Sequence, residues 1–405
     1  MLNLECVRGE KKMGKFDKLI KELCPDGVEW KEIGEFLDYE QPTKYIVKST
    51  EYSDKYDIPV LTAGQSFVLG YTNEKDGLYK SSKDKPVIIF DDFTASFHWV
   101  DFVFKIKSSA MKMLTPKSKD SINFRFIYHC MKNIGYSNND HTRQWIGKYS
   151  KFKIPIPPLE LQEEIVHILD LFTNLTEELT AELTARRKQY EYYRDKLLMF
   201  GDGVEWKQFG ECATIFRGAS PRPIREFITT DSSGVNWIKI GDVKIGEKYI
   251  TCSEERITKE GAEKSRFVKK GDLILSNSMS FGRPYILKIN GCVHDGWLII
   301  SNFSNYYLTD FLYYLLNSNI YQNEMKKKAS FGGAVQNLNA NIVKGLVLPL
   351  PPLEEQERIV SILDKFDKLC NDLTEGLPAE IEARRKQYEY YRDKLLTFKE
   401  LEKIN

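Results

Sequence analysis

The stretch Ala185-Arg186-Arg187-Lys188-Gln189-Tyr190-Glu191-Tyr192-Tyr193-Arg194-Asp195-Lys196-Leu197-Leu198 decides how this chain is organised, because it recurs letter for letter from Ala383 to Leu396. Identity of that length indicates an internal repeat. Two further matches extend it: residues 154–163 resemble residues 348–357, and Asp-Gly-Val-Glu-Trp-Lys occurs at 26–31 and again at 202–207. The chain therefore consists of one unit written twice, each a variable block followed by a Pro-Pro pair and a long helix.

Composition places the chain among ordinary soluble proteins. Of its 405 residues 42% are hydrophobic, and the formal net charge is +1, which argues against a simple nucleic-acid coat protein. The seven cysteines form no C-x-x-C pair, which predicts a reducing cytoplasm. The first dozen residues lack the apolar core of a signal peptide, and no segment approaches a membrane span, so we expect a disordered tail and a cytoplasmic protein.

Both variable blocks predict compact domains with mixed, strand-rich sheets. In the first block, β-branched runs bounded by turn residues predict strands at 58–64 and 86–90, and alternation at 99–104 predicts another. Helices are predicted at 16–23, where Pro25 ends the segment, and at 124–131. In the second block we predict strands at 235–240, 272–276 and 297–300, and one helix from 308 to 325.

Each long helix carries an apolar seam whose steps alternate between four and three residues, as in a coiled coil. Thr180-Ala181-Glu182-Leu183 gives the first seam an additional step of four, which is a stutter. In the second helix Gly376 and Pro378 predict a break or kink, whereas the first helix can run unbroken. We expect the helices to pair antiparallel, with the variable blocks at opposite ends of a pseudo-two-fold rod. The seam and partner-facing residues are Ile165, Phe172, Leu179, Leu183, Tyr190, Tyr193, Ile359, Phe366, Leu373, Tyr388 and Tyr391.

These repeated segments resemble a known family. The run Pro-Leu-Pro-Pro-Leu-Glu-Glu-Gln-Glu-Arg-Ile-Val at 349–360, the Thr-Ala-Glu-Leu tetrapeptide and the duplicated Arg-Arg-Lys-Gln-Tyr segment are similar to the specificity subunit of type I restriction-modification enzymes. The order of variable block, helix, variable block and helix covers nearly the whole chain from Phe16. Residues 90–94 with 107–111, and residues 276–284, are similar to segments of two types of target recognition domain.

The resemblance implies an α+β fold in which two mixed α/β target recognition domains are separated by two long antiparallel coiled-coil helices. We divide the chain into a tail and short helix (1–24), recognition domain 1 (25–158), a central helix (159–201), recognition domain 2 (202–352) and a C-terminal helix (353–405). The resemblance also implies that each domain reads one half of a bipartite DNA site in the major groove. The helices would set the spacer and dock two methyltransferase subunits.

Catalysis is expected to lie in other chains. The Pro-Pro pairs follow Ile156 and Leu350, so neither forms the Asn/Asp-Pro-Pro-Tyr/Phe clamp of an adenine methyltransferase. Asp91-Asp92 favours a turn or edge pair over a metal site, because neighbours in a strand point to opposite faces. Cys292 and His294 make a weak case for zinc. We expect no cofactor in this chain; S-adenosylmethionine, ATP and magnesium would belong to the methyltransferase and ATP-dependent restriction subunits.

Candidate DNA contacts follow from loop position and from donors that match base edges or phosphates. The run from His141 to Trp145 lies before the first Pro-Pro pair, and Gln336-Asn337-Leu338-Asn339 occupies the matching place in the second unit. Two unrelated polar sequences at one repeat position suit different base readers on one scaffold; the alternative is that both are solvated loops. Lys326-Lys327-Lys328 suits either phosphate binding or complementation of a helix C-terminus. The full set is Gln65, Lys107, Lys112, His141, Arg143, Gln144, Lys148, Arg217, Arg222, Arg225, Ser276, Asn277, Ser278, Arg283, Lys326, Lys327, Lys328, Gln336, Asn337 and Asn339.

Two other classes of function are weighed against this one. A self-contained DNA methyltransferase with its own recognition domain would need cofactor motifs that the sequence does not show. The other is a coiled-coil adaptor without a DNA role, which a mobility-shift assay with the partner present would separate from a DNA reader.

Overall fold

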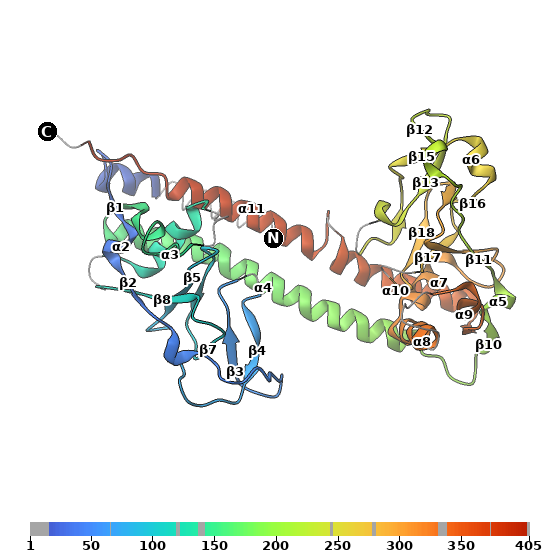
Figure 1. Ribbon diagram of the computed structural model, residues 1–405, viewed down its shortest axis with the longest axis horizontal. Coiled ribbons are helices and arrows are strands. Elements are labelled where there is room, and N and C mark those ends of the chain that lie inside the picture. The colour runs from blue at the N-terminus through green and yellow to red at the C-terminus, as the bar shows by residue number, and fades with distance from the viewer. Residues whose placement is uncertain are drawn as a thin grey trace. The chain divides into compact units, whose positions relative to one another are not determined.

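The computed structural model describes residues 16–64, 66–118, 122–136, 142–243, 246–277, 281–330, 338–372 and 374–402 (Figure 1). The chain forms two compact units, the first of Met1–Glu177 with Ala383–Asn405 and the second of Glu178–Glu382. Each unit contains one variable block together with parts of the long helices. Among the described residues, no helix has the length and apolar character needed to cross a membrane.

The described part of the first unit begins with a helix at residues 16–23, as predicted. Its variable block has a four-stranded sheet of order β2-β8-β5-β6 and a three-stranded sheet of order β4-β3-β7. The elements are β1 (Glu29–Glu32), α2 (Ile33–Phe36), β2 (Leu37–Glu40), η1 (Thr43–Tyr45), β3 (Ile58–Leu61), β4 (Val68–Thr72), β5 (Val87–Asp91), β6 (Phe97–Val100), β7 (Lys105–Ile106), β8 (Met111–Pro116), α3 (Phe124–Asn133), η2 (Tyr149–Lys151) and β9 (Lys153–Ile156).

Strand β5 lies between two apolar layers, which explains its continuous hydrophobic sequence. Ile88 and Phe90 belong to the core that also holds α3 and the first turns of α4 (Leu159–Leu197). Val87 and Ile89 point to the other face, in the core that contains Leu61 of β3 and Ile106 of β7. Because successive strand residues face opposite sides, a strand buried on both faces is apolar throughout.

The second variable block repeats this plan with a larger second sheet. Its sheets have the orders β11-β20-β17-β18-β14 and β12-β15-β13-β19-β16. The elements are β10 (Glu205–Gln208), α5 (Phe209–Cys212), β11 (Thr214–Arg217), η3 (Ile224–Glu226), β12 (Ile228–Thr229), β13 (Val235–Ile238), η4 (Ile240–Asp242), β14 (Tyr249–Ile250), β15 (Glu255–Ile257), α6 (Lys259–Glu263), β16 (Arg266–Val268), β17 (Leu273–Ser276), β18 (Pro284–Leu287), β19 (Gly291–Val293), β20 (Trp297–Ser301), α7 (Thr309–Asn317), α8 (Asn319–Ser330), α9 (Ala340–Lys344) and β21 (Val347–Leu350). Parallel pairs occur within both blocks, β3 with β7 and β13 with β19, so each block contains a mixed sheet as predicted, whereas the β2-β8-β5-β6 sheet is antiparallel throughout.

Two of the repeated segments, although far apart in the sequence, pair as strands within each unit. In the first unit β1 pairs antiparallel with β9, so that Trp30 lies opposite Pro155. In the second unit β10 pairs with β21 in the same register, with Trp206 opposite Pro349. The repeated Asp-Gly-Val-Glu-Trp-Lys segment thus closes each block against the strand that leads into its helix.

The long helices have the continuity that the sequence predicts. Helix α4 runs unbroken for 39 residues, whereas its repeat is divided into α10 (Leu353–Asn371) and α11 (Leu377–Leu395). At the break, Asp372 is extended and its carboxylate accepts hydrogen bonds from the N–H groups of Thr374 and Glu375. Gly376 packs against the carbonyls of Lys368 and Asp372 with no room for a Cβ atom.

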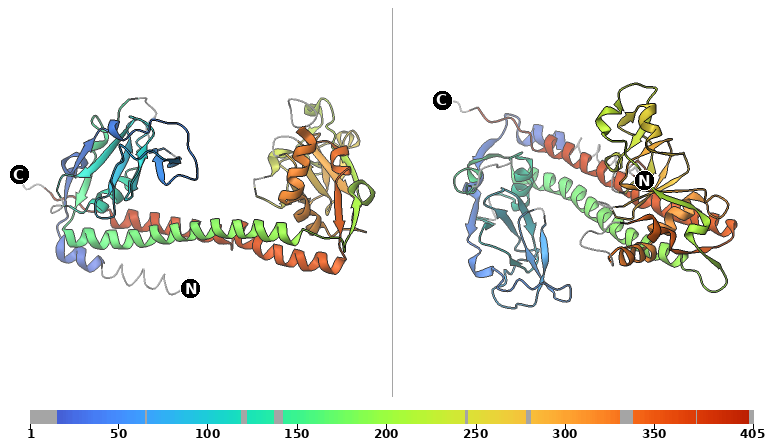
Figure 2. Two further views of the ribbon diagram at one scale, coloured as in Figure 1. Left: turned by 90° about the horizontal axis from the view of Figure 1, so that it is seen from below. Right: turned by 45° about the vertical axis from the view of Figure 1, so that its right-hand side comes forward.

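Within each unit the helices pair through the predicted seam (Figure 2). In the first unit the Phe172 ring of α4 stacks on Tyr391 of α11, with ring centroids 5.1 Å apart. In the second, Tyr190 of α4 lies 6.3 Å from Phe366 of α10, and Arg187 donates to the carbonyl of Cys370. Rising numbers in α4 meet falling numbers in α10, which confirms the antiparallel pairing there.

Two sequence-based predictions of elements were wrong. The strand predicted at 99–104 ends at Val100, and Phe104 instead forms an isolated bridge with Tyr79. The single helix predicted at 308–325 is two helices, because Ser318 is extended and its hydroxyl bonds back to the carbonyl of Leu315. The Asp195 carboxylate then accepts from the backbone and side-chain nitrogens of Asn319 and caps α8, a tertiary contact with no local sequence signal.

Candidate nucleic-acid interface

The two polar segments aligned by the repeat attach at the same corner of equivalent sheets. In the first unit the corner lies where β5 ends beside the start of β8, with Phe90 opposite Lys112. There the Gln144 N–H donates to the carbonyl of Asp92 over 2.7 Å. In the second unit Ser276 pairs with Trp297 at the end of β17, and the Leu338 N–H donates to the carbonyl of Asn277 over 2.9 Å.

Asp92 holds the corner of the first domain together. Its buried carboxylate accepts from the backbone N–H groups of Gln144 and Trp145 through Oδ1, while Oδ2 lies 3.3 Å from the Lys112 Nζ. The carboxyl group of neighbouring Asp91 instead caps the turn at Phe93, so the turn interpretation of this acidic pair is confirmed. Asp92 was not among the predicted site residues, although it positions the polar loop.

Two predicted contacts of the first domain require correction. Lys112 is 1% exposed, and its ammonium lies over the Tyr39 ring beside Asp92. Gln144 is fully buried; its amide oxygen accepts from Tyr136 and its amide nitrogen donates to Thr142. Their polar groups are used within the domain, because a buried charge or amide must find partners there.

The exposed cations at this corner remain predicted DNA contacts. Arg143 has 62% of its side chain exposed, and its Nη1 lies 4.0 Å from the Asp92 Oδ2. Lys148 is exposed on the same loop, next to Ile146, which is 58% exposed. Lys107 is also exposed and donates to the Tyr52 hydroxyl.

In the second domain the cations gather on the loop that follows β11. Asp295 organises it: the carboxylate accepts from the Ser220 hydroxyl at 3.0 Å and lies 3.9 Å from Arg217 and 3.7 Å from Arg222. Arg222 is 84% exposed, so one carboxylate leaves this surface with an excess of positive charge. Such a surface can meet phosphates and the acceptor edges of guanine.

A pocket of about 340 Å³ adjoins this loop. Arg225 lines it together with Trp237, Lys239, His294 and Asp295. Burial lowers the pKa of His294 below its ordinary value, so at neutral pH the positive charge at the pocket comes from Arg225 and Lys239. Lys239 is paired with Glu255 at 2.7 Å.

Two predicted contacts of the second domain, Ser276 and Asn277, also require correction, and a third, Asn339, has a structural role while its DNA contact stays a prediction. Ser276 is fully buried, and its hydroxyl accepts from the backbone of Arg283. Asn277 is 5% exposed and its side chain donates to the Asp295 carbonyl, so it supports the arginine loop. Asn339 is the N-cap of α9 and accepts from the N–H of Ile342, a role for which asparagine is strongly preferred.

The remaining predicted cations lie elsewhere in the second unit. Arg283 lines a pocket together with Arg187, Tyr190 and Asp367. Lys328 pairs with Glu324 at 2.7 Å and donates to the carbonyl of Gly345, which favours a structural interpretation for that lysine. The neighbouring exposed lysines remain predictions: Lys326 and Lys327.

Several predicted residues lie outside the described part of the chain, and their roles stay predictions. They are Gln65, His141, Ser278, Gln336 and Asn337 among the DNA contacts, and Leu373 in the helical seam.

The seam residues divide into buried, half-buried and exposed positions. Ile165, Phe172, Tyr190, Ile359 and Tyr391 are buried, whereas Leu179, Leu183, Phe366 and Tyr388 are half-buried and Tyr193 is 39% exposed. Tyr192 and Tyr390, which belong to the tyrosine clusters interpreted from the sequence as seam and partner contacts, lie off the seam and are 61% and 62% exposed. Their contact with a partner stays a prediction.

Comparisons with known proteins agree with this architecture. The sequence profile described as "Type I restriction modification DNA specificity domain" matches residues 25–186 and again residues 202–383. The chain is 42% identical over 414 residues to the type I restriction enzyme EcoR124I/EcoR124II specificity subunit of Escherichia coli, covering 97% of this chain and all of that protein. It is 33% identical to a putative type I restriction enzyme specificity subunit of Haemophilus influenzae, with 92% and 96% of the two chains covered.

Solved structures share the fold. The S subunit of a type I restriction-modification system from M. genitalium matches with a TM-score of 0.56 and 14% identity, covering 91% of this chain and 96% of that one. A second solved structure is described as showing the structural basis of complex assembly and conformational transition of the type I R-M system. One of its chains matches with a TM-score of 0.58 and 17% identity, covering 92% of this chain and 98% of that one.

A duplicated recognition domain on repeated long helices defines a class of non-catalytic DNA-recognition scaffolds. The chain belongs to the type I restriction-modification DNA specificity family, in which it is a specificity subunit.

Proposed function

We propose that each recognition domain reads one half of a bipartite DNA sequence through the corner described above. In the first domain Arg143, Lys148 and Lys107 would contact DNA. In the second domain Arg217, Arg222 and Arg225 would do so. The observation that carries this proposal is that equivalent sheet corners bear unrelated exposed cations, while residues 185–198 and 383–396 of the helices are identical. Different readers on one scaffold are expected to differ where they touch bases and to agree where they touch a common partner.

The helices would bind two methyltransferase subunits, one at each copy of the repeated segment. Tyr192 and Tyr390 supply matching exposed aromatic side chains for that contact, and aromatic residues are enriched at protein interfaces. ATP-dependent restriction subunits would join for cleavage. S-adenosylmethionine, ATP and magnesium would be bound by those partners, in the cytoplasm where the host DNA lies.

The test is to map adenine methylation made by this chain co-expressed with its methyltransferase partner in a host without its own adenine methylation. We expect one bipartite motif with a fixed spacer. A contiguous motif would refute the two-reader proposal, and methylation by this chain without a partner would favour the self-contained enzyme. A mobility-shift assay with the partner present separates DNA reading from the adaptor alternative, which predicts no sequence-dependent shift.

A further inference from the structure

One carboxylate occupies the same place in both repeats, where each recognition domain meets its helix. The helix sequences around it are Gln-Glu-Glu-Ile-Val-His-Ile-Leu-Asp, ending at Asp170, and Gln-Glu-Arg-Ile-Val-Ser-Ile-Leu-Asp, ending at Asp364. The glutamine that opens each run makes the same contact: Gln162 accepts from the N–H of Asn123, and Gln356 accepts from the N–H of Leu308. Asn123 and Leu308 are the N-cap residues of α3 and α7, so the two junctions correspond.

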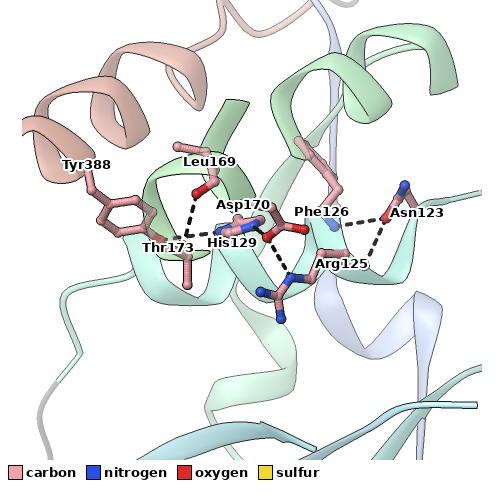
Figure 3. A network of polar contacts seen from close by, with 8 residues as sticks. All are labelled: Asn123, Arg125, Phe126, His129, Leu169, Asp170, Thr173 and Tyr388. Carbon is pink, nitrogen blue, oxygen red and sulfur yellow. Dashed lines mark hydrogen bonds and ion pairs between the residues drawn. The ribbon is translucent and has the colours of Figure 1, made fainter. Parts of the chain in front are cut away.

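In the first unit Asp170 joins three elements (Figure 3). Its Oδ1 accepts from the Arg125 Nε at 2.8 Å and from the His129 Nε2 at 2.9 Å, both on α3. The other ring nitrogen of His129 accepts from the Tyr388 hydroxyl of α11 at 3.3 Å. Burial alone would raise the pKa of Asp170, but the hydrogen bond from His129 and the charge of Arg125 lower it, so the carboxylate is ionised.

In the second unit Asp364 meets different donors. Its Oδ1 accepts from the Tyr314 hydroxyl of α7 and from the Lys248 Nζ at 2.9 Å. Tyr314 follows the N-cap of α7 at the same distance along the helix as His129 follows that of α3. The Lys248 side chain is 7% exposed and also bonds Asp310 at 2.7 Å, so a buried ammonium group joins two partly exposed carboxylates at the second junction.

Together with the hydrogen bonds of Gln162 and Gln356, these contacts are directional, unlike the apolar packing of the same junctions. Around them the domain meets its helix through apolar side chains; in the first unit Phe126 of α3 and Ile165 and Leu169 of α4 belong to one core. Apolar contact is non-directional and tolerates small rotations, whereas a charge-assisted hydrogen bond fixes both distance and angle. The helix side of the contact is an aspartate in both repeats, and the donors on the recognition domains are not the same.

We propose that Asp170 and Asp364 are positioning residues that fix the angle of each recognition domain on its helix, and thereby restrict the spacer between the half-sites. This inference rests on the proposed reading of a bipartite site. The aspartates are the common hydrogen-bond acceptors on the helices. Each recognition domain supplies its own donors, which are His129 and Arg125 in the first unit and Tyr314 and Lys248 in the second.

The experiment uses the complete methyltransferase complex and a DNA library in which the spacer is one or two base pairs shorter or longer than the native one. The variants are Asp170→Asn and Asp364→Asn. Matched controls are Glu163→Gln and Glu357→Gln, which remove an exposed carboxylate at corresponding positions of the same helices. We expect methylation of off-length spacers relative to the native spacer to rise about tenfold in the aspartate variants, since one charge-assisted hydrogen-bond network is lost. The controls should match wild type, and the bases of each half should stay the same.

Two milder variants keep the test decisive if an aspartate variant does not assemble. Tyr388→Phe and Tyr314→Phe each remove one hydroxyl from the network while leaving the ring in place. Native spacer selectivity in these and in the assembled aspartate variants would overturn the proposal. Altered bases within a half-site would also overturn it, because the residues would then act on base recognition. If wild type itself made no bipartite motif, the proposed function would fail instead.

Discussion

Identical tyrosines in the two copies of the repeated segment are expected to differ in their contribution to stability. Tyr391 is 8% exposed and stacks on Phe172 with ring centroids 5.1 Å apart. Its counterpart Tyr193 is 39% exposed and lies 6.0 Å from the equivalent Phe366. Three residues earlier the order reverses, because Tyr190 is buried whereas Tyr388 is half-buried. Sequence identity alone predicts equal effects, so replacement by alanine separates the two expectations.

The magnitude follows from the buried fraction of each ring. Removing a fully buried aromatic side chain costs about 3–5 kcal/mol, so Tyr391→Ala should lie in that range. Tyr193 has roughly three-fifths of its surface buried, which reduces the expected cost of Tyr193→Ala to about 2–3 kcal/mol. The difference of about 1–2 kcal/mol corresponds to roughly 2–8 °C in melting temperature for units of this size.

Hydrogen exchange as a function of urea, followed by mass spectrometry, measures this difference in each unit separately. Peptides covering β5 report unfolding of the first unit, where Tyr391 lies, and those covering β17 report the second. Tyr190→Ala and Tyr388→Ala serve as the crossed pair, with the larger loss expected for Tyr190. Equal losses for Tyr193 and Tyr391, or the same order in both pairs, would refute the argument from burial.

Arg143→Ala and Arg222→Ala should each weaken specific DNA binding by about 1–3 kcal/mol and relax only their own half of the motif, which competition with half-site variants will measure. Duplicating Thr180-Ala181-Glu182-Leu183 adds ~6 Å of helix at ~1.5 Å per residue, so the methylated motif should gain one or at most two base pairs of spacer, and an unchanged spacer in an active variant would contradict this. Burial lowers the pKa of His129 below its ordinary 6.5, so the unfolded chain binds a proton more readily than the folded chain. The free energy of unfolding should therefore fall as pH drops below about 6.5, by at most ~1.4 kcal/mol per pH unit. In urea titrations at several pH values, this free energy should depend less steeply on pH in His129→Gln. Tyr192→Ala and Tyr390→Ala should reduce assembly with the methyltransferase while leaving the melting temperature of the isolated chain nearly unchanged, and normal assembly with altered base preference would assign these tyrosines to DNA instead.

Local pattern was sufficient for most elements of the fold. The apolar run at β5 is buried on both faces, and a break occurs where Gly376 and Pro378 predicted one. The errors arose where a distant residue decided the outcome. Asp195 caps the start of α8 and divides a segment that had the pattern of one helix, and no local signal announces a partner 124 positions away.

The candidate site was harder to predict, because residue type does not reveal whether a polar group is already paired. Lys112, Gln144 and Asn277 have the right donors for DNA, but each uses them inside its domain. Asp92 and Asp295, which organise the two corners, are carboxylates that accept hydrogen bonds, so their residue type did not identify them as part of a DNA-binding site.

The sequence by itself determined the duplication, the alternation of recognition block and helix, and the family. A long exact repeat and a regular apolar seam can be read directly from the order of residues. Tertiary structure decided which member of each identical pair is buried, which cations reach solvent, and which donors meet Asp170 and Asp364. The physical reason is that burial and hydrogen-bond pairing depend on what packs against a side chain. In this protein, those neighbours come from segments far away in the chain.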